Sequence, residues 1–245
     1  MRTNISPELR KVAHFVGQCK VIKRIIWPIY KIYLDKLKSN RLHCMHSYGE
    51  RILSEFDKAL ISNGIPYYVM FGTLLGTIRE KGFIKHDLDI DTCIWNKDYS
   101  DKIQSILEAN GFIRVRHFLI EDGKLGREET YTKDGVDIDI FYIYNDDDRG
   151  PYTCDFLSYD PNIDIYQSMN LYGRVTSRRL YLPFSYTFER APFESIEVNI
   201  PKNSHNVLEA RYGKNYMIPD PSFRTRDENQ NIVRMDNLTA IFIKD

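Results

Sequence analysis

The sequence has few cysteines, no excess of charge of either sign and no long apolar run, and each absence excludes a class of protein. Its four cysteines form no CxxC pair, so neither a disulfide framework nor a zinc site is indicated. The balance of 34 basic and 34 acidic residues argues against a protein that grips a long nucleic acid by its phosphates. Because there is also no uncharged apolar stretch of about 18 residues and no signal-peptide core, the expected location is the cytoplasm.

The charge is unevenly distributed along the chain. Residues 1–41 hold ten Lys or Arg and two Asp or Glu, a net charge of +8, which leaves −8 for the remainder. Mixed apolar and basic positions predict a helix over residues 7–40, which Pro28 is expected to kink or split. A basic amphipathic helix can lie on the anionic inner face of the cell membrane, with Trp27 and Tyr30 as interfacial anchors. The alternative is a helix that packs on the rest of the protein, residues 42–245.

The composition, 42% hydrophobic and 28% charged over 245 residues, is typical of a globular domain. Periodicity and glycine or proline breaks predict helices over residues 46–63, 74–81, 97–110 and 204–212. The same signals predict strands over residues 67–71, 88–95, 112–120, 128–133, 136–144, 186–190 and 193–200. The tyrosine-rich stretch from residue 152 to about residue 185 has no clear pattern. The order of elements indicates an α/β (α+β) fold, a mixed β-sheet flanked by helices.

Two of the predicted strands carry aspartates at alternate positions. Side chains alternate between the faces of a strand, so Asp89 and Asp91 share one face, and Asp137 and Asp139 share a face in the later strand. If the two strands were adjacent, the crowded carboxylates would favour a hard divalent cation, and Mg²⁺ or Mn²⁺ suits an all-oxygen ligand set. Two such ions could align the attacking and leaving oxygens on phosphorus. Each strand taken alone also fits an ordinary solvent-exposed sheet face.

Gly72 and Thr73 stand between a predicted strand and a predicted helix. A glycine turn at this position would leave backbone N–H groups available to hold a phosphate at the positive end of the helix dipole. Thr73 could instead be a simple helix N-cap.

Three segments together resemble the signatures of the LicD and fukutin-related family. They are FGTLLGTIREKGFIKHDLDIDTCIW (71–95), VDIDIF (136–141) and APFESIEVNIPKNSHNVLEARYGKNYMIP (191–219). The resemblance implies a nucleotidyltransferase (polymerase-beta-like) fold for residues 42–245, with divalent metal and a nucleotide-diphosphate donor such as CDP-choline or a CDP-alditol. Leu88 departs from the pattern because it interrupts a run of three acids that the family usually has, and this puts the usual donor specificity in doubt.

The resemblance also implies roles for individual residues. Asp89 and Asp91 match the paired metal ligands, and Asp139 matches the third acidic residue, which binds metal or accepts the acceptor's proton. Gly72 and Thr73 match the phosphate-binding turn, and Arg79 matches a helix arginine that contacts donor phosphates.

His86, just before the acidic strand, is either a substrate contact or an ordinary surface histidine. Near the C-terminus, residues 211–213 are interpreted as a helix end that packs on the sheet.

The function expected from these features is metal-dependent transfer of a phosphorylated group, of the phosphocholine or alditol-phosphate type, from a CDP-linked donor to a hydroxyl of a glycan or glycolipid. Modification of lipopolysaccharide, capsule or teichoic acid is the corresponding process. A nucleotidyltransferase that attaches NMP to a small molecule or protein is the alternative within enzymes. A binding protein that kept the fold without the chemistry is the alternative outside them.

Overall fold

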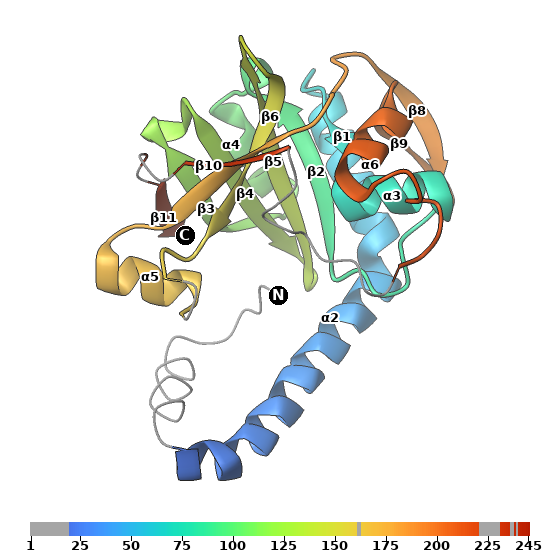
Figure 1. The fold of residues 1–245 in the computed structure, drawn as a ribbon. Coiled ribbons are helices and arrows are strands. Elements are labelled where there is room, and N and C mark those ends of the chain that lie inside the picture. The colour runs from blue at the N-terminus through green and yellow to red at the C-terminus, as the bar shows by residue number, and fades with distance from the viewer. Residues whose placement is uncertain (1–19, 161–162, 221–230, 236–237, 239) are drawn as a thin grey trace.

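The structure is a computed structural model that describes residues 20–160, 163–220, 231–235, 238 and 240–245 (Figure 1). The first described element is one long helix, α2 (Lys20–Ile61), which continues through Pro28. The helix was expected to be kinked or split at Pro28, and it is not split there; over their described residues, the helices predicted at 7–40 and 46–63 are one helix. No glycine or proline stands at residues 41–45, between the two predicted helices, to separate them. Residues 7–19 of that prediction lie outside the described part of the chain.

The two halves of α2 differ in their surroundings. Its C-terminal half buries one face, on which Ile52, Leu53 and Phe56 are fully covered. Its N-terminal half extends away from the body of the molecule, and Ile32 there is 69% exposed (Figure 1). Within the described residues, none of the helices has the length and apolar character needed to cross a membrane.

A curled, mainly antiparallel sheet forms the centre of the molecule, with strand order β10-β7-β6-β5-β4-β3-β11. The strands of this path are β3 (Ile113–Ile120), β4 (Gly126–Lys133), β5 (Val136–Asp146), β6 (Gly150–Leu157), β7 (Thr176–Tyr181), β10 (Ile232–Arg234) and β11 (Ala240–Lys244). The curl brings Val175, just before β7, into a bridge with Ala240 of β11. Two further strands, β1 (Tyr68–Val69) and β2 (Asp89–Trp95), extend the sheet from β5.

Helices and one hairpin cover this sheet. Helix α3 (Phe71–Arg79) packs on β2, α6 (Ser204–Tyr212) packs on α3, and α4 (Lys102–Ala109) packs between α2 and β3 (Figure 1). Helix α5 (Ile165–Tyr172), with a capping box at Asp164, packs against β11. The hairpin of β8 (Phe188–Phe193) and β9 (Ile196–Pro201) contacts β1 and α3. The predicted mixed α/β architecture with helices flanking a sheet is confirmed.

Most predicted elements are present, with three differences. The strand predicted over residues 67–71 ends at Val69, because Phe71 already begins α3 with φ of 42°. The helix predicted over residues 97–110 is divided into a 3-10 helix, η1 (Asn96–Asp98), and α4. The stretch without a clear pattern contains β6, α5 and β7.

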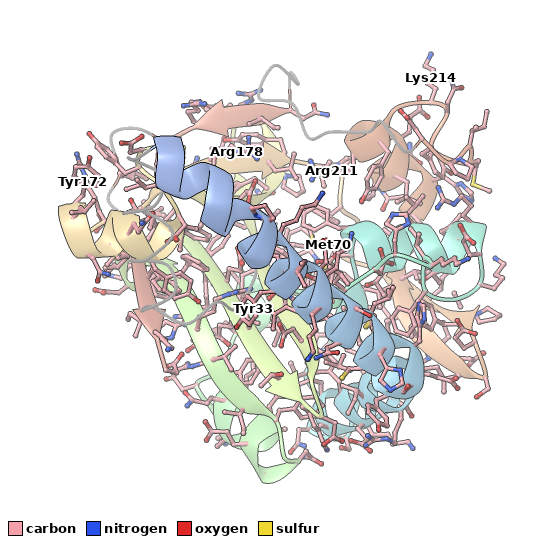
Figure 2. All side chains as sticks on the ribbon, turned by 90° about the horizontal axis from the view of Figure 1, so that it is seen from below. Tyr33, Met70, Tyr172, Arg178, Arg211 and Lys214 are labelled. Atoms are coloured by element: carbon pink, nitrogen blue, oxygen red, sulfur yellow. The ribbon has the colours of Figure 1, made fainter. Side chains whose placement is uncertain are left out.

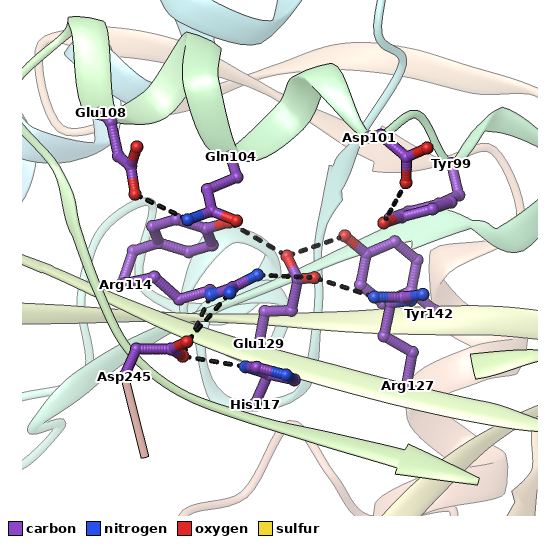
Figure 3. Close-up of polar contacts among 11 residues, drawn as sticks. Tyr99, Asp101, Gln104, Glu108, Arg114, His117, Arg127, Glu129, Tyr142 and Asp245 are labelled. Atoms are coloured by element: carbon purple, nitrogen blue, oxygen red, sulfur yellow. Dashed lines mark hydrogen bonds and ion pairs between the residues drawn. The ribbon is translucent and has the colours of Figure 1, made fainter. Parts of the chain in front are cut away.

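A buried polar network holds the α4 side of the sheet together (Figure 3). The Glu129 carboxylate, 2% exposed, accepts hydrogen bonds from the hydroxyls of Tyr131 (3.1 Å) and Tyr142 (3.2 Å) and from Arg127 Nη1 (3.2 Å). Asp245, at the end of β11, bonds Arg114 and His117 of β3 in the same network. A buried charge needs such partners, so this network is structural and lies apart from the cavity described next.

Candidate active site

The acidic strands predicted from the sequence are neighbours in the sheet. β2 and β5 pair in parallel with Asp89 opposite Asp137 and Asp91 opposite Asp139. Opposed residues of parallel strands point to the same face, so all four carboxylates share one face. Asp137 and Asp139 are 7% and 5% exposed. The predicted convergence of Asp89, Asp91 and Asp139 is therefore present in the structure.

This face forms the floor of a cavity of about 1300 Å³. The predicted site residues that line it are Gly72, Arg79, His86, Asp89, Asp91 and Asp139. Thr73 is buried behind them and does not line it. The other cavity-lining residues are Lys38, Arg41, Phe71, Leu75, Ile84, Asp87, Leu88, Phe141, Asp155, Leu180, Arg211, Tyr212, Asn215, Tyr216, Ile218, Pro219 and Asp220.

Gly72 and Thr73 tie the first turn of α3 to Asp91. The backbone N–H of Gly72 donates to Asp91 Oδ2 (3.1 Å), and the Asp91 N–H donates to the hydroxyl of Thr73 (2.9 Å). The N-cap position belongs to Met70, so the interpretation of Thr73 as the N-cap is wrong. A helix N-terminus stabilises negative charge, and here its N–H points at a carboxylate of the site.

Asp87 is a third acidic group on the β2 side, which the site prediction omitted. A Cβ built on Gly72 would lie 3.4 Å from Asp91 Oδ2 and 3.5 Å from Asp87 Oδ1, so the two carboxylates approach the same point. Burial raises the pKa of Asp87 to about 7, although a hydrogen bond from the N–H of Ile84 acts to lower it. Asp87 precedes the alternating strand by two residues, and that same-face spacing was the signal available in the sequence.

Asp91 is the most perturbed carboxylate of the site. Burial raises its pKa well above the usual value, and the neighbouring charges of Asp89, Asp139 and Asp87 raise it further, while the Gly72 N–H acts in the opposite direction. The carboxylates therefore repel one another, and a bound cation would relieve that repulsion.

Two arginines partly compensate the acidic floor. Arg41 of α2 lies 3.0 Å from Asp137 Oδ2 and 3.8 Å from Asp89 Oδ2. Arg116 of β3 lies 3.4 Å from Asp139 Oδ1, the oxygen that also accepts a hydrogen bond from the Thr130 hydroxyl. Neither arginine was predicted, because each belongs to an element whose position beside β2 and β5 is set only by the folded chain.

Part of the remaining cavity wall is cationic and aromatic. Arg79 contacts Glu80 (2.9 Å) and the carbonyl of Tyr216 (3.5 Å). The Arg211 guanidinium lies 4.9 Å from the centre of the Phe71 ring. Figure 2 labels Arg211 and also Met70, the residue before Phe71. His86 is exposed at the edge of the cavity.

The C-terminal end of α6, which was predicted to pack on the sheet, belongs to a helix that packs on α3, and this end reaches the cavity. Gly213 closes the helix with φ of 90°, and Arg211 and Tyr212 line the cavity. The family-like motif at residues 211–213 was the sequence signal that could have identified Arg211 and Tyr212 as site residues.

The acidic side chains of the site suit a divalent cation. Asp87, Asp89 and Asp91 offer carboxylate oxygens, the ligands that Mg²⁺ and Mn²⁺ prefer. Their electrostatic strain also fits a cation, because the two buried members have raised pKa values. In the described ranges no group of three or more His, Cys, Asp or Glu side chains is already arranged as a metal cage. The residues thus fit a cation in charge and ligand type.

The fold and the site together define a mixed α/β domain that presents carboxylates of two parallel strands to a cavity. The family model described as "LicD/FKTN/FKRP, nucleotidyltransferase domain" matches residues 64–203, more than half of the chain. The chain therefore belongs to this family. The match includes every site residue predicted from the sequence, whereas Arg41 and Arg211 lie outside it.

Curated relatives carry the name ribitol-5-phosphate transferase FKTN. The chain is 26% identical to the Mus musculus protein over 191 residues, covering 75% of this chain and 36% of the relative. It is 25% identical to the Homo sapiens protein over 178 residues, covering 70% of this chain and 33% of the relative. The chain thus spans about a third of the length of these relatives.

Proposed function

We propose that this protein transfers a phosphorylated group, of the alditol-phosphate or phosphocholine type, from a nucleotide-diphosphate donor to a hydroxyl of a glycan or glycolipid. The observation that carries the proposal is the parallel register of β2 and β5, which places Asp89 and Asp91 beside Asp139 in the lining of one cavity. Membership in the LicD/FKTN/FKRP family and similarity to proteins named ribitol-5-phosphate transferase support it. We also propose the nucleotidyltransferase (polymerase-beta-like) topology, which the family model's description supports.

In this proposal Asp89 and Asp91 hold Mg²⁺ or Mn²⁺, in one or two ions, with Asp139 as a further ligand. Bound cations would neutralise the charge of the donor diphosphate. The acceptor oxygen forms a bond to the phosphorus of the transferred group, the bond from that phosphorus to the nucleotide breaks, and a nucleoside monophosphate leaves. Asp139 alternatively accepts the acceptor's proton. Its Oδ1 already engages Thr130 and Arg116, so we assign the cation or proton to Oδ2.

The cavity offers two chemically different ends for the two substrates. We assign the donor to the end formed by α3 and α6, because Arg79 and Arg211 can compensate phosphates and Tyr212 offers an aromatic ring. His86, at the edge, remains a proposed substrate contact. We assign the acceptor to the end formed by β6 and β7, where Asp155 can accept hydrogen bonds from sugar hydroxyls. In-line attack requires the two substrates on opposite sides of the phosphorus.

The test is a panel of CDP-, UDP- and GDP-linked donors incubated with the protein and Mn²⁺, with mass spectrometry of the products. Release of a nucleoside monophosphate with a phospho-group on the acceptor supports the proposal, with a CDP-linked donor expected. Release of pyrophosphate with NMP attached to the acceptor would instead identify a nucleotidyltransferase. Absence of turnover together with absence of Mn²⁺ binding would leave a binding protein of the same family.

We further propose that residues 1–41 act as an accessory segment to a catalytic domain of residues 42–245, at the cytoplasmic face of the membrane. The described start of α2 supports this with exposed Lys31, Lys36 and Lys38 beside exposed Ile32 and Tyr33. Figure 2, seen from below, shows this part of α2 in front with Tyr33 on it. Co-sedimentation with anionic but not neutral vesicles at low salt is expected, and equal binding to both would oppose the proposal.

A further inference from the structure

Helix α2 contributes a cation to the acidic floor from outside the family-matched segment. Arg41 Nη2 lies 3.0 Å from Asp137 Oδ2 and 3.8 Å from Asp89 Oδ2, and it donates a hydrogen bond of 3.1 Å to the carbonyl of Leu88. Asp137 and Asp89 face each other across the parallel pair, and the Arg41 guanidinium reaches both strands. The contact therefore joins α2, β2 and β5 at the candidate metal site.

The two carboxylates that Arg41 contacts are not equivalent. The side chain of Asp137 is 9% exposed and lies at hydrogen-bonding distance, whereas that of Asp89 is 42% exposed and lies farther from the guanidinium. A buried carboxylate needs a close partner more than an exposed one does, because water screens the exposed charge. Asp137 is therefore the main partner of Arg41, and Asp89 is a secondary partner that a different cation can take over.

A cation held by Asp89 would lie close to this guanidinium. Two positive charges in a partly buried site repel each other strongly, so Arg41 opposes cation binding as long as no further negative charge is present. A donor diphosphate supplies such charge and would attract both cations at once. The geometry thus couples the binding of the cation to the binding of the donor.

We infer that Arg41 is a positioning residue that makes divalent-cation binding at Asp89 depend on the nucleotide diphosphate. The inference rests on the proposed function. The simpler role for Arg41 is to anchor α2 to β5 through Asp137. An anchor affects the stability of the fold, whereas the inferred role affects the ratio of Mn²⁺ affinities with and without nucleotide.

The experiment measures Mn²⁺ affinity by electron paramagnetic resonance, with and without CDP and corrected for Mn²⁺–CDP in solution. Wild type should bind Mn²⁺ more tightly with CDP than without it. Arg41→Gln should bind Mn²⁺ without CDP about fivefold more tightly than wild type and equally tightly with CDP, so the enhancement by CDP, which is the coupling between the two ligands, should fall by the same factor. Arg41→Lys, which keeps the charge, should behave like wild type. Lys36→Gln removes a charge from an exposed position of α2 outside the cavity and serves as the matched control.

The possible outcomes distinguish the inferred role of Arg41 from a purely structural one. If wild type binds Mn²⁺ and folded Arg41→Gln shows the same affinity and the same enhancement by CDP, Arg41 is only an anchor and the inference fails, while the proposed function stands. If neither protein binds Mn²⁺ in the presence of CDP, the metal-dependent function fails as well. If Lys36→Gln reproduces the effect of Arg41→Gln, general charge rather than the contact with Asp89 and Asp137 is responsible, and the inference is overturned. Circular dichroism establishes that the variants are folded.

Discussion

The backbone N–H of Gly72 donates a hydrogen bond of 3.1 Å to Oδ2 of Asp91, which joins the first turn of α3 to the acidic strand β2. The Asp91 N–H in turn donates to the Thr73 hydroxyl, so the link runs in both directions. It fixes the orientation of the most perturbed carboxylate of the site relative to the cavity. Gly72 and Thr73 thereby position Asp91, whatever further contact they make with substrate.

Asp91→Asn separates the chemistry of the site from its stability. The raised pKa of Asp91 means that its negative charge is unfavourable in the folded protein, and the variant removes that charge. The free energy of unfolding of Asp91→Asn at pH 8 should therefore equal or exceed that of wild type. Turnover should fall by at least about 100-fold, because loss of a metal ligand costs no less than loss of its supporting contacts. Thermal unfolding and donor-dependent release of nucleotide measure the two effects. Asp89→Asn should lose turnover to the same extent, and near-normal turnover in either variant would remove this site from consideration.

Asp87 predicts the pH dependence of stability in the metal-free protein. Its pKa is raised to about 7 in the folded state, so the folded protein binds this proton more tightly than the unfolded chain. The contribution of Asp87 to the free energy of unfolding should therefore fall by up to about 4 kcal/mol as the pH rises from about 4 to about 7. Above that pH it should stay constant. Urea denaturation in EDTA, from pH 5 to pH 8, should show a flatter profile for Asp87→Asn than for wild type. Identical slopes would contradict the assignment.

Replacing either of two glycines of α3 by alanine should have opposite effects on stability and on turnover. In Gly72→Ala the new methyl group would stand 3.4 Å from Asp91 Oδ2 and 3.5 Å from Asp87 Oδ1, contacts that the fold tolerates. Stability should be retained or gain about 0.5–1 kcal/mol, as for glycine replaced within a helix. Turnover should fall about tenfold or more, because the methyl group displaces ligand oxygens or phosphate.

Gly76→Ala is the matched comparison. Its methyl group would meet the backbone carbonyl of Gly82 at 2.4 Å, so about 1–3 kcal/mol of stability should be lost. The activity of the molecules that remain folded should be unchanged, because Gly76 does not line the cavity. Loss of turnover in both variants without loss of stability would contradict this division.

Asp155→Asn tests the assignment of the acceptor end. Asp155 is held by Arg178 and lines the cavity away from α3. The variant should raise the KM for the acceptor about tenfold or more while leaving the KM for the donor within about twofold, as expected when one charged hydrogen bond is lost. Asp147→Asn, in the exposed turn after β5, removes the same charge and should change neither value. A rise in the donor KM alone would reverse the assignment of the two ends.

Glu129→Gln should destabilise the protein without touching the site. The carboxylate is buried among Tyr131, Tyr142 and Arg127, so its neutralisation leaves a buried guanidinium without its charge partner (Figure 3). A loss of about 3–5 kcal/mol is expected, as when one member of a buried ion pair is removed. Chemical denaturation measures it. Turnover at low temperature, where the variant is folded, should equal that of wild type, and loss of turnover there would connect this network to the site.

Patterns that depend on near neighbours in the chain were predicted well. The alternation of Asp89 with Asp91 and of Asp137 with Asp139 predicted which side chains share a face, because the side-chain period of a strand is a local property. The helix that ends at Gly213 and the strand β2 were located to within a residue for the same reason. The start of α3 was missed, because the positive φ of Phe71 begins the helix without a recognisable capping residue.

Local patterns along the chain specify the chemistry that this protein offers: acidic residues at alternate positions, a glycine before a helix and a set of motifs that resemble one family. The folded arrangement is what pairs β2 with β5 in parallel, brings Asp87 to the site and places Arg41 and Arg116 beside its carboxylates. The physical reason is distance along the chain. Contacts between segments far apart in sequence arise from how helices and strands bury their apolar faces together, and no local pattern records that packing.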